Sequence, residues 1–185
     1  MKKNSHKYLV FGVLLFVVLG CSSFMDGVKK GMGGGPPQVM TSTDGTYQLT
    51  VPGNWTKQTD LNSIATLQAA NTKEELYVIV IKESKTDFPA NANVGTVAEL
   101  ARENLRKTVI TPIISEAVPA SIGSYPARQF EVSGTVSGVQ AKYLYGVVET
   151  TGYYYQIMTW TLAPRFDANK SKMQDVINSF KEIIK

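Results

Sequence analysis

The segment Leu76-Tyr77-Val78-Ile79-Val80-Ile81 constrains the fold more than any other part of this sequence. Its β-branched residues favour an extended strand. A strand at the surface of a sheet alternates apolar and polar side chains, whereas this one is apolar on both sides. We therefore expect it to lie centrally in a sheet that is covered on both faces.

Further strands are predicted on both sides of this segment. Residues 127–136, 140–150 and 153–162 are strand-like, and the turns between them are Ser137-Gly138 and Thr151-Gly152, which are typical of hairpins. Shorter strands are expected at residues 47–51, 63–70 and 113–117.

Two helices are predicted to cover this sheet. The first runs from Thr96 to about Lys107, begins with a Thr96-x-x-Glu99 capping box, and would turn inward Val97, Leu100, Ala101 and Leu105. The second begins near Asp167 and carries an apolar stripe at helical spacing, formed by Met173, Val176, Ile177, Phe180 and Ile184. Together these elements predict an α+β domain.

The N-terminus has the pattern of an export signal. Lys2, Lys3 and Lys7 precede an apolar run at residues 9–19, which is short for a bilayer-spanning helix of about 20 residues. The run ends in Val18-Leu19-Gly20-Cys21, which resembles the bacterial lipobox. The resemblance implies a signal peptide at residues 1–20 and lipidation of Cys21. An uncleaved anchor helix, or a plain secretory signal with an incidental cysteine, are the alternatives.

Lipidation of Cys21 predicts where the protein resides. More than one acyl chain is needed for stable anchoring, so a multiply acylated Cys21 would hold the chain on a membrane of the cell envelope. Ser22 follows the cysteine, where an aspartate would indicate retention at the inner membrane. We therefore expect the outer membrane, facing the periplasm, if the host has two membranes.

Residues 21–43 are expected to form a lipidated, flexible tether, because Gly33-Gly34-Gly35-Pro36-Pro37 favours neither helix nor sheet. Residues 44–185 would then be one domain. Three of the 19 basic residues belong to the signal peptide, which leaves 16 against 15 acidic residues. A mature chain this close to neutral is not expected to bind nucleic acid.

Several stretches of residues 44–185 resemble the PsbP-like domain: "YQLTVPGNW", "SIGSYPARQFEVSG", "GYYYQIMTWTLAPRF" and "VINSF". The resemblance implies a twisted antiparallel sheet sandwiched by helices, an α/β/α arrangement. It also implies a binding or assembly module without catalysis. No metal or partner residue of the family carries over.

The residue types left in the mature chain argue against an enzyme. The only histidine, His6, belongs to the signal peptide, and the only cysteine is the predicted lipid attachment point. The mature chain therefore lacks the histidine and free cysteine that Ser-His-Asp and Cys-His catalytic sites require. It also lacks the ligands of a Cys/His zinc site. The carboxylate pairs Glu74-Glu75 and Glu99-Glu103 are expected to be solvated surface charge. We expect no cofactor and no metal.

An aromatic group on the late strands is the remaining candidate site. Its simplest interpretation is cross-strand pairing beneath a helix. The alternative is a binding surface, because Tyr and Trp supply contact area with a polar handle, and Arg128 could stack on such rings. The candidate residues are Arg128, Tyr143, Tyr145, Tyr153, Tyr154, Tyr155 and Trp160.

Two functions follow as hypotheses. The first is an envelope lipoprotein whose domain binds a protein partner or aids assembly of an envelope complex. The second is a lipoprotein that binds a small molecule or lipid in a pocket between sheet and helix. A ligand site needs a concavity of roughly 300 Å³ or more with a few polar groups, whereas a protein-binding surface can be flat.

Overall fold

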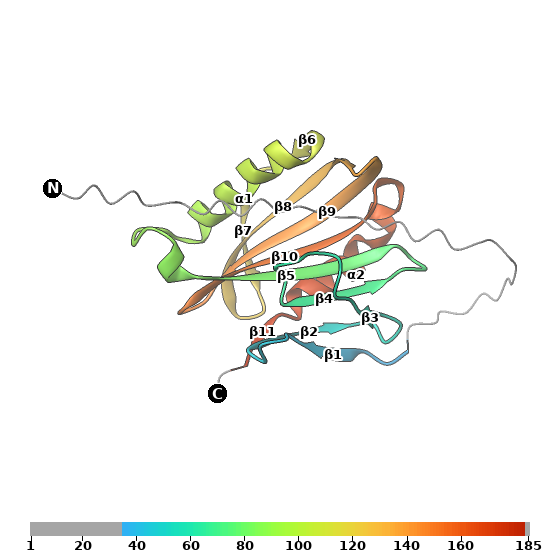
Figure 1. Cartoon of the computed structure of the whole chain (residues 1–185), viewed down its shortest axis with the longest axis horizontal. Helices are drawn as coiled ribbons and strands as arrows, with labels where there is room; N and C mark the ends of the chain where they lie inside the picture. Colours follow the sequence, from blue (N-terminus) through green and yellow to red (C-terminus); the bar gives the residue numbers. More distant parts are fainter. Residues whose placement is uncertain (1–34, 184–185) are drawn as a thin grey trace, which may run out of the picture.

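The computed structural model describes residues 35–183 and has a large antiparallel sheet at its centre (Figure 1). The strand order is β3-β4-β5-β10-β9-β8-β6, with β7 also pairing with β8. A small sheet of order β1-β2-β11 lies beside it. The strands are β1 (Gln38–Thr41), β2 (Tyr47–Val51), β3 (Thr56–Lys57), β4 (Leu67–Asn71), β5 (Leu76–Ser84), β6 (Ile110–Ile114), β7 (Val118–Ile122), β8 (Tyr125–Val136), β9 (Val139–Glu149), β10 (Tyr153–Leu162) and β11 (Lys181–Glu182), and the helices are α1 (Val94–Thr108), α2 (Phe166–Asn178) and the 3-10 turns η1 (Lys85–Asp87) and η2 (Ala163–Arg165).

The central strand is where the sequence predicted it. β5 pairs with β4 on one side and with β10 on the other. Ile79 and Ile81 belong to the hydrophobic core on one face of the sheet, and Val78 and Val80 to the core on the opposite face. All four side chains are nearly inaccessible. The prediction of a strand covered on both faces is confirmed.

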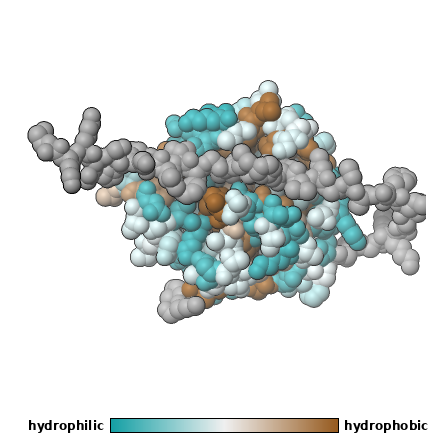
Figure 2. Space-filling model, viewed as in Figure 1, coloured by the Kyte–Doolittle hydropathy of each residue, from teal (hydrophilic) through white to brown (hydrophobic). Residues whose placement is uncertain are grey.

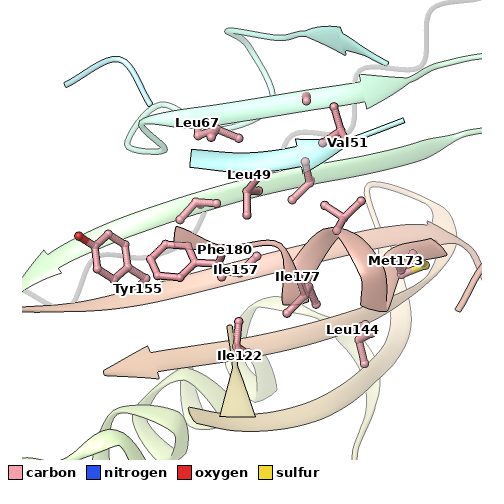
Figure 3. Close-up of a cluster of buried hydrophobic side chains, with 14 of the residues drawn as sticks. Leu49, Val51, Leu67, Ile122, Leu144, Tyr155, Ile157, Met173, Ile177 and Phe180 are labelled. Atoms are coloured by element: carbon pink, nitrogen blue, oxygen red, sulfur yellow. The ribbon is translucent and has the colours of Figure 1, made fainter. Parts of the chain in front are cut away.

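Each face of the sheet is covered by one helix and by additional chain. α1 and Leu61, in the segment between β3 and β4, cover the face that carries Ile79. α2 and the small sheet together cover the other face, where Leu49 of β2 meets Ile177 of α2 over Ile157 of β10 (Figure 3). The predicted α+β sandwich is confirmed, and the structure adds the small sheet as a second cover.

The first helix is rotated and extended relative to the prediction. It begins at Val94, because Asn93 rather than Thr96 is its N-cap, and the Asn93 side chain accepts hydrogen bonds from the N–H groups of Gly95 and Thr96. The predicted inward position of Leu100 is wrong, since this side chain is 43% exposed. Arg102 is buried instead, because it pairs with Glu99 and with Glu116 near the sheet edge.

The second helix is shorter than its apolar stripe predicted. It ends at Asn178, where the hydroxyl of the C-cap Ser179 accepts a bond from Thr50 N–H and donates to the Thr50 carbonyl. This contact directs the chain into β11, which pairs with β2. Phe180 is still buried, as expected, although it lies outside the helix. Ile184 lies outside the described residues.

Two other segments differ from the sequence predictions. The strand expected from residue 63 begins at Leu67, because Asn62 N–H donates to the Gln68 side chain and holds the preceding turn. In place of the single strand expected at residues 113–117, β6 ends at Ile114 and β7 begins at Val118, and the two strands pair with successive parts of β8.

The predicted tether is too long at its C-terminal end. Residues 38–41 form β1, which pairs with β2 along its whole length, and the Gln38 amide donates to the Trp55 carbonyl at 2.7 Å. A polar segment becomes a strand here because an existing strand edge supplies its hydrogen-bond partners. The rest of the predicted tether through residue 34, the signal peptide and Cys21 lie outside the described residues. Within residues 35–183, no helix is both long and apolar enough to cross a membrane.

We predict that Phe180→Ala strongly destabilises the domain. The Phe180 ring contacts those of Tyr155, Tyr125 and Tyr47, at centroid distances of 4.7, 5.6 and 5.8 Å. Loss of a buried phenyl group of this kind costs about 3–5 kcal/mol. Urea unfolding measures the change. Lys181→Ala is the matched control, because Lys181 is the exposed neighbour, and equal unfolding midpoints for the two variants would contradict this assignment.

Candidate functional site

The structure buries most of the predicted aromatic site. Tyr153 is 37% exposed, and the other aromatic candidates are at most 3% exposed. Side chains this deeply buried cannot form an exposed aromatic patch, so that hypothesis is wrong for Tyr143, Tyr145, Tyr154, Tyr155 and Trp160, of which Tyr154 alone borders a surface hollow. Their burial agrees with cross-strand pairing beneath a helix.

Cross-strand register explains why these rings are buried. Trp160 of β10 lies opposite Tyr77 of β5 and opposite Tyr143 of β9, and its ring is stacked on Tyr77 with centroids 5.1 Å apart. Tyr145 stacks on Phe130 in the same way. The rings thus connect neighbouring strands within the core under α1.

The hydroxyls of these tyrosines are poor candidates for acid–base chemistry. Burial raises the pKa of Tyr143, whose hydroxyl has no hydrogen-bond partner in the part of the chain that the structure describes. Burial, reinforced by the charge of Glu83, raises the pKa of Tyr145, and its hydroxyl donates to the Gln156 side chain. Neither group ionises near neutral pH, so neither is suited to proton transfer, and Tyr145 alone of the two acts as a structural donor.

A surface hollow lies where β5 leaves the sheet. The connection between β5 and α1, which borders it, is at the left of Figure 1. It has a volume of about 530 Å³ and is open to solvent. The segment between β5 and α1 forms most of its wall, and β10 contributes one residue. The lining residues are Lys85, Thr86, Phe88, Pro89, Ala90, Ala92 and Tyr154.

Several contacts hold the wall of this hollow against the sheet. Tyr154 donates a hydrogen bond from its hydroxyl to the Ala92 carbonyl at 2.9 Å, and Phe88 packs edge-on against its ring. The backbone N–H of Lys85 donates to the Gly152 carbonyl in the β9–β10 turn. The hollow is therefore held by contacts to the sheet at both ends of the segment.

Glu149 organises the charges at this end of the sheet. One of its carboxylate oxygens pairs with Lys85 at 2.7 Å, and the other accepts a hydrogen bond from Val94 N–H, the first of α1, at 2.9 Å. Asn93 accepts the next two helix N–H groups. The N-terminus of α1 is thus capped by the protein's own side chains, which leaves no donors there for an external anion.

Arg128 lies close to the same helix terminus. The Arg128 guanidinium lies beside Gly95 in the first turn of α1. Its Nε and Nη2 atoms are 3.8 Å from the position that a Cβ atom would occupy at this glycine. Arg128 and Tyr154 are consequently both at the α1 side of this end of the sheet. Tyr153 lies on the opposite face, because successive side chains of a strand alternate.

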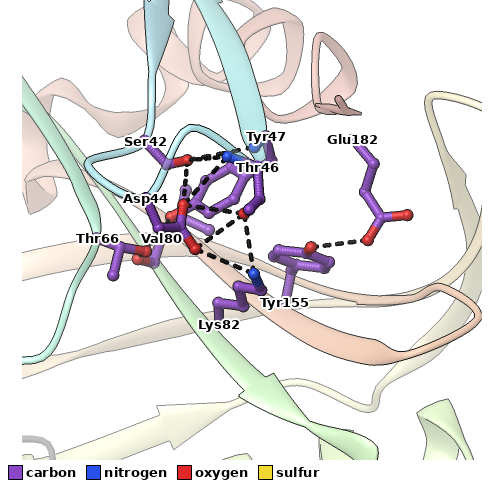
Figure 4. Close-up of polar contacts among 9 residues, drawn as sticks. All are labelled: Ser42, Asp44, Thr46, Tyr47, Thr66, Val80, Lys82, Tyr155 and Glu182. Carbon is purple, nitrogen blue, oxygen red and sulfur yellow. Dashed lines mark hydrogen bonds and ion pairs between the residues drawn. The ribbon is translucent and has the colours of Figure 1, made fainter. Parts of the chain in front are cut away.

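A polar network around Asp44, Thr46 and Lys82 lies on that opposite face (Figure 4). The Lys82 ammonium lies 4.1 Å from the centroid of the Tyr153 ring, pairs with Asp44 at 3.0 Å and donates to the Thr46 hydroxyl at 2.9 Å. These contacts connect the β1–β2 turn to the large sheet. A lysine held by a carboxylate and a ring in this way serves as a structural contact.

The neighbouring tyrosine contact was absent from the sequence predictions. Tyr155 donates its hydroxyl hydrogen bond to Glu182 at 2.7 Å, and burial raises the pKa of this tyrosine, with further contributions from Glu182. This hydrogen bond connects β11 to β10.

Three of the four carboxylates in the predicted pairs are paired with cations, whereas Glu103 is exposed on α1. Glu74 accepts a hydrogen bond from Lys172, which lowers the pKa of Glu74. Glu75 pairs with Arg165, and Glu99 with Arg102. Among residues 35–183, no group of three or more His, Cys, Asp or Glu side chains is placed to hold a metal ion.

Sequence reasoning missed the segment 85–93 and the role of Glu149. The segment has no hydrophobic periodicity, and Glu149 lies 55 residues from the helix N–H that it accepts. The only local signal was Asn93, a favoured N-cap residue one position before the helix.

Neither a protein-family model nor a curated protein sequence matches the chain. Solved structures do match. Cyanobacterial PsbP (CyanoP) from Synechocystis sp. PCC 6803 aligns with a TM-score of 0.58 at 17% identity, covering 85% of this chain and 98% of that one. LpqN of Mycobacterium tuberculosis, involved in cell envelope biogenesis, aligns with a TM-score of 0.58 at 14% identity, covering 80% and 91%. At these identities the likeness shows the fold, which is PsbP-like.

We predict that Asp44→Asn destabilises the domain at neutral pH and not in strong acid. Partial burial alone would raise the pKa of Asp44, but hydrogen bonds from Ser42, Lys82 and Thr46 outweigh it and lower the pKa from 3.8 to about 2. A lowered folded-state pKa contributes stability above pH 3.8 that is lost as pH falls toward 2.

Urea unfolding of the variant and the wild type across this pH range measures the contribution. The difference between them should shrink steadily as the pH approaches 2. Asp60→Asn, at an exposed position, is the control. A difference for Asp44→Asn that does not depend on pH would show that the network does not depend on the carboxylate charge.

Proposed function

We propose that this chain, whose body has the PsbP-like fold, is a cell-envelope lipoprotein held on a membrane by acylated Cys21. Its domain would recognise a protein partner, or aid assembly of an envelope complex, without catalysis. The lipobox pattern at residues 18–21 supports the anchor. The structural likeness to LpqN, a protein involved in cell envelope biogenesis, supports the location.

The observation that carries the recognition proposal is the hollow beside Tyr154. Its wall is largely apolar, formed by Phe88, Pro89 and two alanines, and it opens at the surface. Such a depression can accept one side chain or a short segment of another protein, and anchors of this kind dominate the energy of protein interfaces. Lys85 at its border supplies a polar contact.

The hollow stands far from the point where the chain enters the domain. In Figure 1 the start of β1 is at the right and the 85–93 segment at the left. A domain tethered through residues 22–34 would therefore present the hollow away from its anchor. A partner could reach the hollow without competing with the membrane.

Binding of a small molecule or lipid is the alternative. The spaces between the sheet and both helices are filled by the two cores, so the pocket would be the hollow itself. Its volume of about 530 Å³ exceeds the minimum for a small ligand, and Lys85 and Thr86 supply polar groups. Its openness favours a protein side chain, which needs less enclosure than a free ligand.

A non-catalytic role is supported by the chemistry of the described residues. The described range contains no histidine or cysteine, and the buried tyrosines have raised pKa values. We further propose that the membrane is the outer one, with the domain facing the periplasm, if the cell has two membranes. Ser22 supports this location, because it stands where an aspartate would indicate retention at the inner membrane.

We predict that Cys21→Ala blocks lipidation and processing of the protein. Without the thiol no diacyl group can be attached, and the signal peptide should remain uncleaved. Mass spectrometry of the purified protein and fractionation of cells measure both effects. Ser22→Ala is the control. A Cys21→Ala protein that matures to the wild-type mass and fractionates with membranes would remove lipidation from the proposal.

We predict that Ala90→Trp, which fills the hollow, abolishes partner capture. Blocking an interface anchor should weaken capture by at least about tenfold. A tagged pull-down from solubilised membranes measures it, and the melting temperature should stay within a few degrees of the wild type. Ala168→Trp, at an exposed position of α2, is the matched control.

Two outcomes would redirect this proposal. Capture that survives Ala90→Trp would place the partner surface elsewhere. A small molecule that raises the melting temperature of the wild type but not of Ala90→Trp, while the variant still captures its protein partner, would favour the ligand-binding alternative.

A further inference from the structure

The strands at the edges of the two sheets differ in how well they are protected against pairing with another chain. The edge strands are β3, β6 and β7 of the large sheet and β1 and β11 of the small one. β3 and β11 have two residues each and carry charged side chains, and β6 and β7 each contain a proline. Short length, charge and proline are the features by which proteins prevent edge-to-edge association. β1 has four residues, with neither a charge nor a proline among them.

The outer edge of β1 has no neighbouring strand within residues 35–183. β1 pairs with β2 alone and lies at the lower margin of the domain in Figure 1. Val39 is 58% exposed, and Thr41 is also exposed. Figure 2 shows hydrophobic atoms at this margin, where β1 lies in Figure 1. A second chain can therefore approach the backbone of β1 from outside.

The ladder between β1 and β2 shows which backbone groups of β1 point outward. Ser42 N–H donates to the Tyr47 carbonyl at 2.9 Å, and successive residues of an antiparallel strand bond alternately to the two sides. The even-numbered residues of β1 therefore bond to β2. The N–H and C=O groups of Val39 and Thr41 point away from β2, and none of them has a hydrogen-bond partner among residues 35–183.

Both ends of this free edge are closed to further pairing. Thr43 N–H already donates to the Thr66 carbonyl at 2.8 Å, so Thr43 has no free donor. Pro37 has no N–H to donate. The chain also leaves the line of the strand at these ends, with a bend at Pro36 and a turn from Thr43. The pairing surface is consequently limited to β1 itself.

These limits select one pairing register, and it is self-complementary. Two copies of β1 can run antiparallel about a two-fold axis, with Val39 of each copy opposite Thr41 of the other. Every outward N–H then meets an outward C=O. The next bonded register in one direction would place Thr41 opposite Pro37, which lacks a donor. The next register in the other direction would place Val39 opposite Thr43, whose donor is already used.

We propose that two copies of this chain associate through β1, so that their small sheets form one continuous sheet across a two-fold axis. The interface is isologous, because each copy contributes the same strand. Met40 of one copy faces Met40 of the other on the axis, at a position where antiparallel strands bring their side chains closest. Val39 of each copy lies beside the Thr41 side chain of the other, and β-branched neighbours of this kind stabilise a sheet.

This pair should be weak in dilute solution and form where the copies are concentrated. A contact through one short strand buries far less surface than the roughly 1,200 Å² of a stable complex in solution. Anchoring on a shared membrane raises the effective concentration of the copies. In this respect the inference rests on the lipid anchor proposed above. The two-fold axis agrees with such an anchor, because both tethers begin at the same height along the axis and both lipids can reach one bilayer.

Disulfide cross-linking tests the register on the full chain in the cells that produce it. Cys21 is the only cysteine of the sequence and the proposed lipid attachment point, so Met40→Cys supplies the single free thiol. Residues opposite each other at such a position have Cα atoms about 4.5 Å apart, which a disulfide can bridge. Val39→Cys is the matched control, because the two copies of Val39 are diagonal neighbours about 7–8 Å apart, beyond the reach of an unstrained disulfide.

We expect mild oxidation with diamide to give several-fold more disulfide dimer from Met40→Cys than from Val39→Cys. Non-reducing gels measure the yield, and mass spectrometry identifies the linked peptides. This order is opposite to the order of exposure, because Val39 is 58% exposed whereas Met40 is partly buried against the core. Collisions between exposed thiols would favour the control.

A proline on the free edge separates strand pairing from side-chain contact. Adding Thr41→Pro to Met40→Cys should lower the dimer yield by about tenfold, because each copy loses an outward donor. The lost N–H points away from β2, so the melting temperature should stay within a few degrees of that of Met40→Cys. Thr41→Val, which keeps the N–H, should leave the yield unchanged.

Amide hydrogen exchange tests the wild-type chain without any substitution, and it decides the matter if Met40→Cys fails to fold. The purified lipidated protein is incorporated at rising density into phosphatidylethanolamine–phosphatidylglycerol vesicles. The Val39 and Thr41 amides should exchange several-fold more slowly at high density. The Thr43 amide is the internal control, because it already donates to Thr66 and should not change.

Several results would overturn the proposal. A Val39→Cys yield equal to or above that of Met40→Cys would mean random collision, and a yield that survives Thr41→Pro would remove the β1 ladder. Exchange at Val39 and Thr41 that does not depend on density would do the same. A disulfide from Met40→Cys to a different protein would replace the second copy by another partner. Oxidative dimers of the wild type through Cys21 would instead contradict the lipid anchor, which distinguishes the two proposals.

Discussion

The pairing of β5 with β10, buried on both faces, is the constraint on which the rest of the structure depends. Ile79 and Ile81 need cover on one side and Val78 and Val80 on the other, and neither side may reach water. One helix cannot cover both faces of a sheet. The chain therefore places α1 on one face and α2 with the small sheet on the other.

The same constraint absorbs the aromatic residues. A wide sheet under a single helix leaves space that small side chains cannot fill, and large rings on adjacent strands fill it by stacking, as Trp160 does between Tyr77 and Tyr143. The hydroxyls that enter the core become difficult to ionise. Recognition is then left to the edges of the sheet and to the connections between its elements.

The two ends of the sheet differ in chemistry. At one end the 85–93 segment borders an open, largely apolar hollow, and Glu149 neutralises both Lys85 and the terminus of α1. At the other end, β6 follows the last turn of α1 and exposes Ile110 and Ile113.

The sequence by itself determined the class of the fold, its central strand, the late hairpins and both covering helices, because side-chain periodicity is a local property of the chain. The proposed export signal and lipid anchor also depend on local patterns, at residues 1–21. Only the tertiary structure decided which side chains are exposed. Tyr153 and Tyr155 share a face of one strand, yet one is exposed and the other is buried by β2 and Phe180. The strand at residues 38–41, the inward Arg102 and the hollow beside Tyr154 likewise arise from contacts between residues far apart in the chain, which no local pattern encodes.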